Sequence, residues 1–340
     1  MMFYMRSEQV LVRKLGIVTN PSQLDEQDTF FLFVNEAIKR DGLEVYIFDA
    51  DDVLSRNRVR TKLIKGPIQF ASRERLNRKT TIQSLSDFDL IFLKKNPPVD
   101  KDYKLLLEKL FTENVPTVNS GEGIQKMGSK AYLKHFSQIT PMTFFANGVQ
   151  EALGFIRKIG NCVIKQSDSY GGKGVDHIRF KFNKYYGYKG RKETLLSEKA
   201  VIEIIEKYLG LSKDKTLLVV EYFLSAPERG DKRIVILEGD VLGSYIRLPD
   251  AENGMCDGTD NGARLYDPTK RDHEIVKMLK PHLKKNNIQL AALDLLVDKA
   301  GVEHLSEINV FNPGFCNLDV VHPELNIVKK VVDMLCAKMA

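Results

Sequence analysis

The sequence lacks the features that mark membrane-spanning and fibrous proteins. No apolar run approaches the roughly 18 residues that a helix needs to cross a bilayer, and the first 13 residues show no long apolar stretch followed by small residues. We therefore expect no membrane span and no secretory signal. The 23 glycines and 12 prolines follow no period, which excludes a collagen-like chain. Hydrophobic residues make up 43% of the chain, enough to exclude disorder as its main state.

Cysteine is also sparse. Cys162, Cys256, Cys316 and Cys336 lie far apart, and they form no CxxC pair and no His/Cys cluster. The sequence therefore offers no zinc site. Widely spaced thiols in a chain of 340 residues fit a reducing cytosol better than a disulfide framework. We expect a cytoplasmic protein.

The excess of one charge sign is small. The chain has 51 Lys and Arg against 45 Asp and Glu, a net charge of +6. Anionic small molecules explain such an excess as well as nucleic acid would. The length suggests about two domains, at roughly 150 residues each, and no internal repeat is present.

The first third of the chain is typical of a parallel α/β sheet, because short apolar strands alternate with helices. Its expected elements are strands at 14–18, 43–48, 89–93 and 116–119 and helices at 30–40 and 101–111. The basic segment 53–78 has a weaker pattern, which we interpret as a strand pair with polar loops. A loop just after the carboxyl end of a strand is where such sheets bind ligands.

The rest of the chain predicts a middle lobe followed by a mostly antiparallel α+β lobe. The expected strands are 162–165, 217–220, 232–237, 241–248, 291–297 and 302–310, and the expected helices are 149–159, 198–209 and 272–285.

A glycine-rich loop at 168–174 follows an apolar strand that ends in Lys165. Gly171 and Gly172 would let the backbone approach phosphate oxygens closely, and a lysine at a strand end can direct its ammonium at a phosphate. The loop is neither a P-loop nor a GxGxxG turn that opens a helix. Taken alone, the loop is more typical of a hairpin turn, and Lys165 is equally compatible with a surface lysine at a strand end.

Three oxygen-bearing side chains predict a metal site. Asp294 lies inside the apolar run 291–296, while Glu307 and Asn309 lie two residues apart on the next expected strand, and so on one face of it. A hairpin around 298–301 would bring the three together, and such oxygens suit Mg²⁺ in combination with nucleotide phosphates. The alternative is a solvated strand face, which the apolar run disfavours.

The order of these parts is that of an ATP-grasp ligase, and the chain resembles prokaryotic glutathione synthetases along nearly its whole length. Residues 94–100, KKNPPVD, are similar to the family's RKDPPFD, and residues 165–172 match the family's KPLDGMGG in spacing, in Lys, in Asp and in both glycines. The other matching segments are 28–30 (DTF), 44–46 (EVY), 115–120 (VPTVNS), 230–233 (GDKR) and 307–309 (EIN).

The resemblance implies an ATP-grasp fold, α/β and α+β, that carries an N-terminal pre-ATP-grasp parallel α/β domain. The implied domains are an N-terminal domain at 1–129 on the acyl-substrate side, a central lid lobe at 130–225, and a C-terminal catalytic lobe at 226–340 with the Mg²⁺ site.

The resemblance also implies roles for individual residues. Lys130 and Lys165 would contact the ATP phosphates, and Gly171 and Gly172 would lie in the loop that covers them. The adenine would be held through backbone groups of Glu221, Tyr222, Phe223 and Leu224. Mg²⁺, or Mn²⁺ in its place, would bind Asp294, Glu307 and Asn309. Arg233 and Lys165 would be catalytic, and the residues facing the substrate would be Asp28, Thr29, Lys94, Asn96 and Arg247.

Two departures from the family pattern concern the substrates. Lys94 stands where the family has Arg, which removes a planar guanidinium fork. The loop at 253–264 is shorter than in the family and lacks its Arg-Gly-Asn segment. We therefore expect recognition of the acid and of the amine to differ from the family pattern.

The leading hypothesis is an ATP-dependent carboxylate–amine ligase that joins γ-glutamylcysteine and glycine through an acyl phosphate, as the resemblance implies. A related ligase for another acid and amine is the enzymatic alternative, and a non-catalytic ATP-binding module is another. The basic, tyrosine-rich stretch 181–192 also fits a nucleic-acid binder, although a solvated insertion between two strands explains it more simply. The expected partners are small-molecule or peptide substrates and a second copy of the chain, without nucleic acid or membrane.

Overall fold

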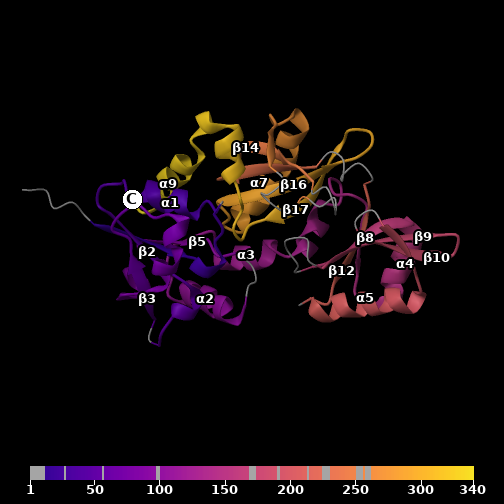
Figure 1. The fold of residues 1–340 in the computed structure, drawn as a ribbon, viewed down its shortest axis with the longest axis horizontal. Helices are drawn as coiled ribbons and strands as arrows, with labels where there is room; N and C mark the ends of the chain where they lie inside the picture. The colour runs from indigo at the N-terminus through magenta and orange to yellow at the C-terminus, as the bar shows by residue number, and fades with distance from the viewer. Residues whose placement is uncertain are drawn as a thin grey trace, which may run out of the picture. The chain divides into compact units, whose positions relative to one another are not determined.

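The computed structural model describes residues 12–26, 28–55, 57–96, 100–167, 174–189, 192–212, 214–223, 230–249, 256 and 262–340. The chain forms two compact units: unit 1 comprises residues 1–121 and 326–340, and unit 2 comprises residues 122–325. Their elements are drawn in Figure 1. The division of the chain into three domains stays a prediction.

Unit 1 is built on a six-stranded sheet of order β4-β3-β2-β1-β5-β6. Its strands are β1 (Arg13–Val18), β2 (Leu43–Phe48), β3 (Arg58–Leu63), β4 (Thr81–Ser84), β5 (Leu90–Leu93) and β6 (Thr117–Val118). β1, β2, β5 and β6 are parallel, whereas β3 and β4 continue the sheet in antiparallel fashion. Because β2 and β5 flank β1 on opposite sides, the strand order reverses next to β1, and such a point is where open α/β sheets bind ligands.

The helices of unit 1 are α1 (Phe30–Ala37), α2 (Lys101–Thr112) and α9 (Ile327–Lys338), with short 3-10 turns at η1 (Pro21–Gln23), η2 (Ala50–Asp52), η3 (Phe70–Asn77) and η4 (Leu85–Asp87). α2 begins at a cap, since the Asp100 side chain accepts the N–H of Tyr103. The C-terminal α9 packs on α1, where Arg40 pairs with Asp333 at 2.7 Å.

The interpretation of 53–78 as a strand pair was wrong. Among the residues of this segment that the structure describes there is one strand, β3, whose partners β2 and β4 both lie outside the segment, and η3 occupies residues 70–77. The η3 turn has only one buried residue, Leu76, and exposed basic side chains surround it. This segment therefore lacks the regular spacing of apolar residues that distinguishes a strand from a helix in a sequence.

Unit 2 begins with an antiparallel sheet of order β11-β10-β9-β8-β12-β7. Its strands are β7 (Thr143–Ala146), β8 (Asn161–Gln166), β9 (Val175–Lys181), β10 (Lys184–Lys189), β11 (Lys192–Leu196) and β12 (Leu217–Glu221). The helices α4 (Val149–Ile159) and α5 (Glu198–Leu211) bury apolar residues such as Leu153, Ile156 and Ile205 in one core with Ile164 and Val219 of the sheet.

The tyrosine-rich stretch 181–192 is not a solvated insertion. It forms the end of β9 and all of β10, which pairs with both β9 and β11. Tyr185 is buried in the core, and the Lys181 ammonium lies over the Tyr186 ring, 4.5 Å from its centroid. Tyr185 and Tyr186 thus serve the packing of this sheet, whereas Phe182 at the β9–β10 turn is exposed.

The second sheet of unit 2 has the order β15-β14-β13-β16-β17, and every pairing in it is antiparallel. Its strands are β13 (Asp231–Leu237), β14 (Asp240–Arg247), β15 (Ala263–Leu265), β16 (Leu290–Val297) and β17 (Glu303–Asn309). The helical elements of this part are α3 (Gly121–Met127), η5 (Lys130–Phe136), α7 (Lys270–Lys285), α8 (Cys316–Val321) and η6 (Pro323–Leu325).

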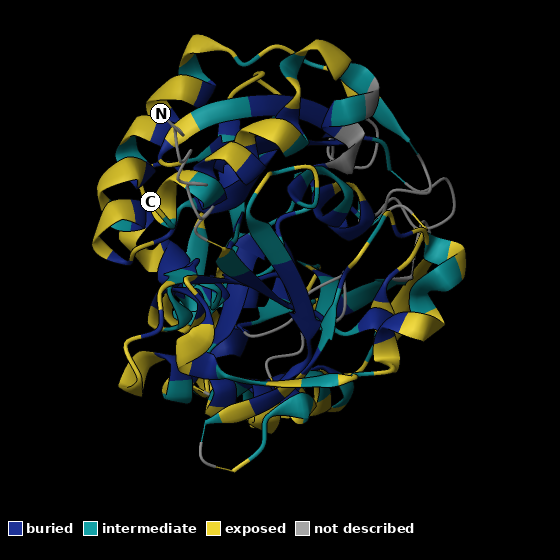
Figure 2. Ribbon diagram, turned by 90° about the vertical axis from the view of Figure 1, so that its left-hand side faces the viewer, coloured by how far each residue is buried: buried dark blue, intermediate teal, exposed yellow. Residues whose placement is uncertain are grey.

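The predicted combination of α/β and α+β parts is confirmed. Figure 2 shows the strands mostly buried and the outward faces of the helices exposed. Within the described ranges, no helix is both long and apolar enough to span a bilayer.

Candidate active site

Candidate functional side chains form a row across the second sheet of unit 2. Arg233 on β13 pairs in register with Asp294 on β16, which pairs with Glu307 on β17. Residues opposite each other in antiparallel strands project to the same face. Tyr245 on β14 extends the row beyond Arg233, and Asn309, two residues after Glu307, lies on the same face. The hairpin that the sequence predicts between β16 and β17 is present.

A β-bulge adjoins this row. The register of β16 and β17 shifts between Asp294 and Leu295, because Leu295 pairs with Leu305 and leaves Ser306 as the extra residue. Bulges of this kind are common beside active sites, where they redirect a side chain. The Ser306 hydroxyl accepts a hydrogen bond of 3.3 Å from the Lys165 ammonium.

The carboxylate of Asp294 is buried and held by two guanidinium groups. Its Oδ1 accepts a 2.8 Å bond from Arg233 Nε, and its Oδ2 accepts bonds of 2.8 Å from Arg233 Nη2 and 2.9 Å from Arg247 Nη2. Burial alone raises the pKa of Asp294, but the charges of Arg233 and Arg247 outweigh it and lower this pKa to about 2. The group is therefore ionised at neutral pH.

Arg247 joins Asp294 to a second carboxylate, that of Asp231. The Arg247 guanidinium donates to both oxygens of Asp231, with its Nε at 2.7 Å. Gly230 allows the backbone before Asp231 to pass close to the Arg247 carbonyl, because it has a φ of +77° and an added Cβ would lie 2.1 Å from that oxygen. The sequence analysis did not assign Asp231 to the site, although its position two residues before Arg233 on one strand places both on the same face.

Two lysines lie at the Glu307 end of the row. Lys130, the first residue of η5, is buried and holds Glu307 Oε1 at 3.3 Å, while its backbone N–H donates to the Ser167 carbonyl. Lys165 ends the apolar part of β8. Burial lowers the pKa of Lys165, and the Lys130 charge lowers it further, whereas Glu307 raises it. The structure thus brings together both predicted phosphate-binding lysines and the predicted metal ligands.

The predicted adenine segment follows β12. The Glu221 and Tyr222 N–H groups donate to the carbonyls of Met142 and Asn161, while Phe223 lies edge-on to His304 with 5.0 Å between ring centroids. Gly171, Gly172 and Leu224 lie outside the described residues, as does most of the 253–264 loop.

A stack of three rings supports this segment. His177 stacks on Tyr222 at 3.9 Å and on Tyr188 at 4.2 Å, and its Nε2 lies 2.7 Å from Asn161 Oδ1. Burial, together with the Arg179 charge, lowers the pKa of His177 to about 4, so the ring is neutral at pH 7. The sequence analysis missed His177, because a single histidine on an expected strand gives no signal.

The predicted acyl-substrate residues of unit 1 lie near the carboxyl end of its sheet. Thr29 is buried before α1, and Asp28 Oδ1 accepts the Phe30 N–H at 2.8 Å and lies 3.4 Å from the ammonium of Lys94, which follows β5. Asn96 is half-buried. Arg247, the fifth predicted substrate residue, lies in unit 2 and contacts Asp231 and Asp294, as described above.

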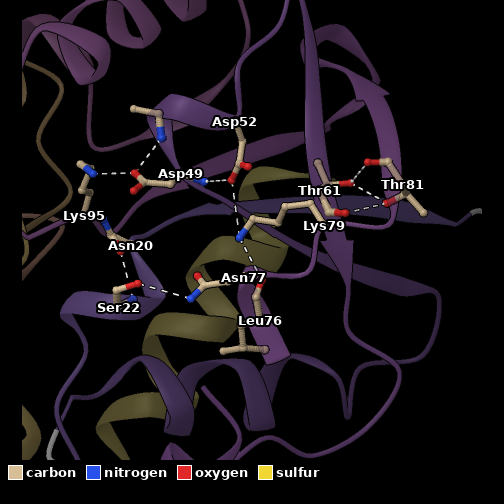
Figure 3. Close-up of polar contacts among 11 residues, drawn as sticks. Asn20, Ser22, Asp49, Asp52, Thr61, Leu76, Asn77, Lys79, Thr81 and Lys95 are labelled. Carbon is tan, nitrogen blue, oxygen red and sulfur yellow. Dashed lines mark hydrogen bonds and ion pairs between the residues drawn. The ribbon is translucent and has the colours of Figure 1, made fainter. Parts of the chain in front are cut away.

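A second buried ion pair lies beside Lys94 in the sequence. The Lys95 ammonium is 2.5 Å from Asp49 Oδ1, directly after β2, and Figure 3 shows this pair together with the Asp49–Asp52 turn. Both side chains are nearly inaccessible to solvent. The sequence analysis missed Asp49, although its place at the carboxyl end of a parallel strand is the signal that would have found it.

The donor set of the row fits a hard divalent cation. Within the described part of the chain, no three His, Cys, Asp or Glu side chains gather into a metal-binding group. Asp294 and Glu307 would therefore need the Asn309 amide oxygen as their third partner. Ionised carboxylates and an amide oxygen are the ligands that Mg²⁺ prefers.

Comparison with known proteins decides the family. The sequence model of the ATP-grasp domain of prokaryotic glutathione synthetase matches residues 129–322, and that of its N-terminal domain matches residues 14–125. The chain belongs to the prokaryotic glutathione synthetase family. It is an ATP-dependent ligase that forms a C–N bond, as the sequence predicts.

The glutathione synthetase of Salmonella typhimurium is 24% identical to the chain over 339 residues, covering 96% of the chain and 99% of that relative. The glutathione synthetase of Gloeobacter violaceus is 28% identical over 248 residues, covering 70% of the chain and 69% of the relative.

Solved structures of other ligases share the fold. A D-cycloserine synthetase superposes with a TM-score of 0.67 at 12% identity, covering 95% of the chain and 99% of that structure. The D-alanyl-alanine synthetase A of Vibrio cholerae superposes with a TM-score of 0.60 at 10% identity, covering 95% and 98%. The predicted ATP-grasp fold is confirmed.

Proposed function

We propose that this ligase joins γ-glutamylcysteine to glycine, with ATP converted to ADP and phosphate. The observation that carries the proposal is the convergence of Lys130, Lys165, Arg233, Asp294 and Glu307. Cations that can neutralise phosphate oxygens lie there beside carboxylates that can bind a metal. This is the distribution of charge that a metal–ATP complex requires.

The reaction has two steps. A carboxylate is a poor electrophile, because its negative charge repels an amine and its oxygen is a poor leaving group. A carboxylate oxygen of the acid attacks the γ-phosphorus of ATP, the bond from that phosphorus to the bridging oxygen breaks, and ADP leaves. The amine then attacks the carbonyl carbon of the acyl phosphate, phosphate leaves with the bonding electrons, and the amine proton passes to solvent. The protein contributes mainly positioning and charge neutralisation.

Lys130 and Lys165 would hold the phosphate groups of the nucleotide. Lys130 is buried and Lys165 half-buried, and each contacts a side chain of β17, so their ammonium groups are positioned before ATP arrives. Asp294, Glu307 and Asn309 would hold Mg²⁺, or Mn²⁺, which when bound offsets the negative charge of the phosphates.

Arg233 and Arg247 would change partners during the cycle. Three guanidinium N–H groups now bind the Asp294 carboxylate. A cation bound to Asp294 would compete with these contacts and leave N–H groups for the transferred phosphate. Arg233 would in this way stabilise the acyl phosphate, as the sequence predicts.

In unit 1, Asp28, Thr29, Lys94 and Asn96 are the candidates for binding the acyl substrate. Lys94 would bind a substrate carboxylate as a point charge rather than as a fork, since it replaces the family's Arg. The ligase would act in the cytoplasm on small molecules or peptides, without nucleic acid, and could form a homo-oligomer. Each of these statements stays a prediction.

Mass spectrometry of reaction mixtures tests the proposal. The protein is incubated with Mg·ATP, γ-glutamylcysteine and glycine, and glutathione is expected in equal amount to ADP. Asp294→Asn is expected to form neither product, whereas Asp240→Asn, an exposed carboxylate at the β13–β14 turn, serves as the matched control. If ADP formed with other acids and no glutathione formed from γ-glutamylcysteine and glycine, the enzyme would be a ligase for a different acid and amine. No ADP with any acid would contradict a ligase site at Asp294.

A further inference from the structure

The positive charge of the chain is concentrated in one segment that the proposed reaction does not use. Residues 58–81 contain eight Lys or Arg and one Glu, a net charge of +7 against +6 for the whole chain. The segment forms β3, η3 and the beginning of β4 in unit 1. It contains none of the residues proposed to bind ATP, metal or the acyl substrate.

This segment encloses a pocket of about 550 Å³, within the range of small-molecule sites. Three cationic side chains line it, those of Lys62, Lys65 and Arg75, and its lining includes no carboxylate. Thr80 and Thr81 are also among its lining residues. All of the charge that the lining presents is therefore positive.

The lining cations lack the partners that other cations of unit 1 have. Lys79 is held by Asp52 at 3.5 Å, and Figure 3 shows its ammonium directed at Asp52 and at the Leu76 carbonyl. By contrast, within the described part of unit 1 no carboxylate forms an ion pair with Lys62, Lys65 or Arg75. Like charges around one concavity repel each other, and an anion in their midst relieves that repulsion.

The pocket is separate from the predicted acyl-substrate residues. Lys62 pairs with Ile47, and the Ile64 N–H donates to the Val45 carbonyl, so the chain runs here toward the amino end of β2. Asp49 and Lys94 instead follow the carboxyl ends of β2 and β5. Ligand binding in the pocket and binding at that edge therefore use different residues.

We propose that this pocket binds a small, multiply charged oxyanion, either a phosphate compound or a polycarboxylate. Arg75 supplies a planar fork that matches two oxygens, Lys62 and Lys65 supply point charges, and Thr80 supplies a hydroxyl donor. The buried side chains of Ile64, Ile68 and Leu76 form an apolar part of the lining for the carbon atoms of such a ligand. A concave site of this size favours a small anion over nucleic acid, which binds along extended grooves.

Hydrogen-exchange mass spectrometry on the full chain tests the proposal, with inorganic pyrophosphate and citrate as separate probes at constant ionic strength. Because the ATP site also attracts anions, the readout is exchange in peptides that cover 62–81. At least one probe is expected to slow exchange there. In the double variant Lys62→Gln/Arg75→Gln the half-maximal concentration is expected to rise about tenfold.

Arg78→Gln is the matched control, because Arg78 is an exposed cation of the same segment that does not line the pocket. It is expected to keep the wild-type response. Both variants should keep the wild-type circular dichroism and ADP formation, since they change only solvated side chains outside the active site. Protection by pyrophosphate alone identifies a phosphate ligand, and protection by citrate alone identifies a polycarboxylate.

Three results would overturn the proposal. These are no protection of 62–81 by either probe at millimolar concentration, equal protection in the double variant and wild type, and protection of 62–81 by a single-stranded oligonucleotide, added as a third probe, but by neither small anion.

Discussion

The chain has two cationic regions that differ in how their charge is balanced. In unit 2, Arg233, Arg247 and Lys130 are buried, and each contacts a carboxylate. Segment 58–81 of unit 1 contains eight Lys or Arg residues and one Glu, and most of these cationic side chains are exposed. Burial explains the difference, because an unpaired charge removed from water costs several kcal/mol, whereas a solvated one costs little. A local excess of positive charge in the sequence therefore indicates the solvated region. It does not indicate the proposed active site, where each of these cations is paired with a carboxylate.

Removing carboxylates from the row is expected to give the largest effect. Asp294→Ala would lower ADP formation at least about 100-fold, because it removes a proposed metal ligand, and would lower the free energy of unfolding by about 3 kcal/mol, because Arg233 and Arg247 lose their buried partner. Glu307→Ala would give a similar loss of activity with a smaller loss of stability, since Glu307 is about one-third exposed. Steady-state kinetics and urea unfolding measure both. Unchanged kcat in both variants would defeat the metal assignment.

Lys165→Met is expected to separate catalysis from stability. Burial disfavours the ammonium, as the lowered pKa of Lys165 indicates, so an apolar side chain of similar length would leave stability nearly unchanged. ADP formation would fall about 100-fold with the loss of the proposed phosphate contact. Lys207→Met, at an exposed position of α5, is the control. If the two variants had equal kcat, Lys165 would have no role in phosphate binding.

The pairing of Asp294 predicts a dependence of stability on pH. Its pKa is about 2 in the folded protein against an ordinary 3.8. The folded state therefore gains stability that is fully present above pH 4 and is lost as the pH falls toward 2, about 2 kcal/mol in all. Urea unfolding at several pH values would show this loss in the wild type and a smaller one in Asp294→Asn. Parallel pH profiles for the two proteins would argue against the pairing.

The smallest effect is expected from the cations of unit 1. Lys65→Gln and Arg75→Gln would leave the melting temperature within about 2 °C of the wild type at physiological salt. At low salt the variants would be slightly more stable than the wild type, because repulsion is then less screened. Differential scanning calorimetry at two salt concentrations measures this. A large loss of stability would mean that these cations have partners, which would erase the contrast between the two regions.

The sequence predicts the apolar elements well. The helix at 149–159 and the strand at 43–48 have the predicted bounds, because continuous apolar runs, helical spacing and glycine ends are local signals. The prediction from sequence fails at 53–78 and 181–192. Most residues of these segments are polar or basic, and only a few buried side chains, such as Leu76 and Tyr185, hold their strands and turns in place.

The proposed site was predictable as a set of residues but not as a network. Asp294, Glu307 and Asn309 stand out by spacing alone. The two guanidinium groups that hold Asp294 follow only from the alignment of β13 with β14 and β16, which depends on tertiary packing. Asp231 contacts Arg247 and His177 stacks on Tyr222. These partners are distant in the sequence, so no local pattern marks Asp231 or His177.

The bulge at Ser306 has a consequence for how this site can vary. In strict alternation Leu305 and Glu307 would point to one side, but the extra residue reverses the phase, so Leu305 and Ile308 both oppose the apolar Leu295 and Leu293. Deleting Ser306 would remove the bulge but keep these faces, because Glu307 would then follow Leu305 directly and still oppose Asp294, with Ile308 opposite Leu293. The deletion would remove the hydroxyl that accepts the hydrogen bond of the Lys165 ammonium. The row of Arg233, Asp294 and Glu307 thus depends on the register of the strands and not on the extra residue, whereas the hydrogen bond that holds the Lys165 ammonium to β17 depends on Ser306.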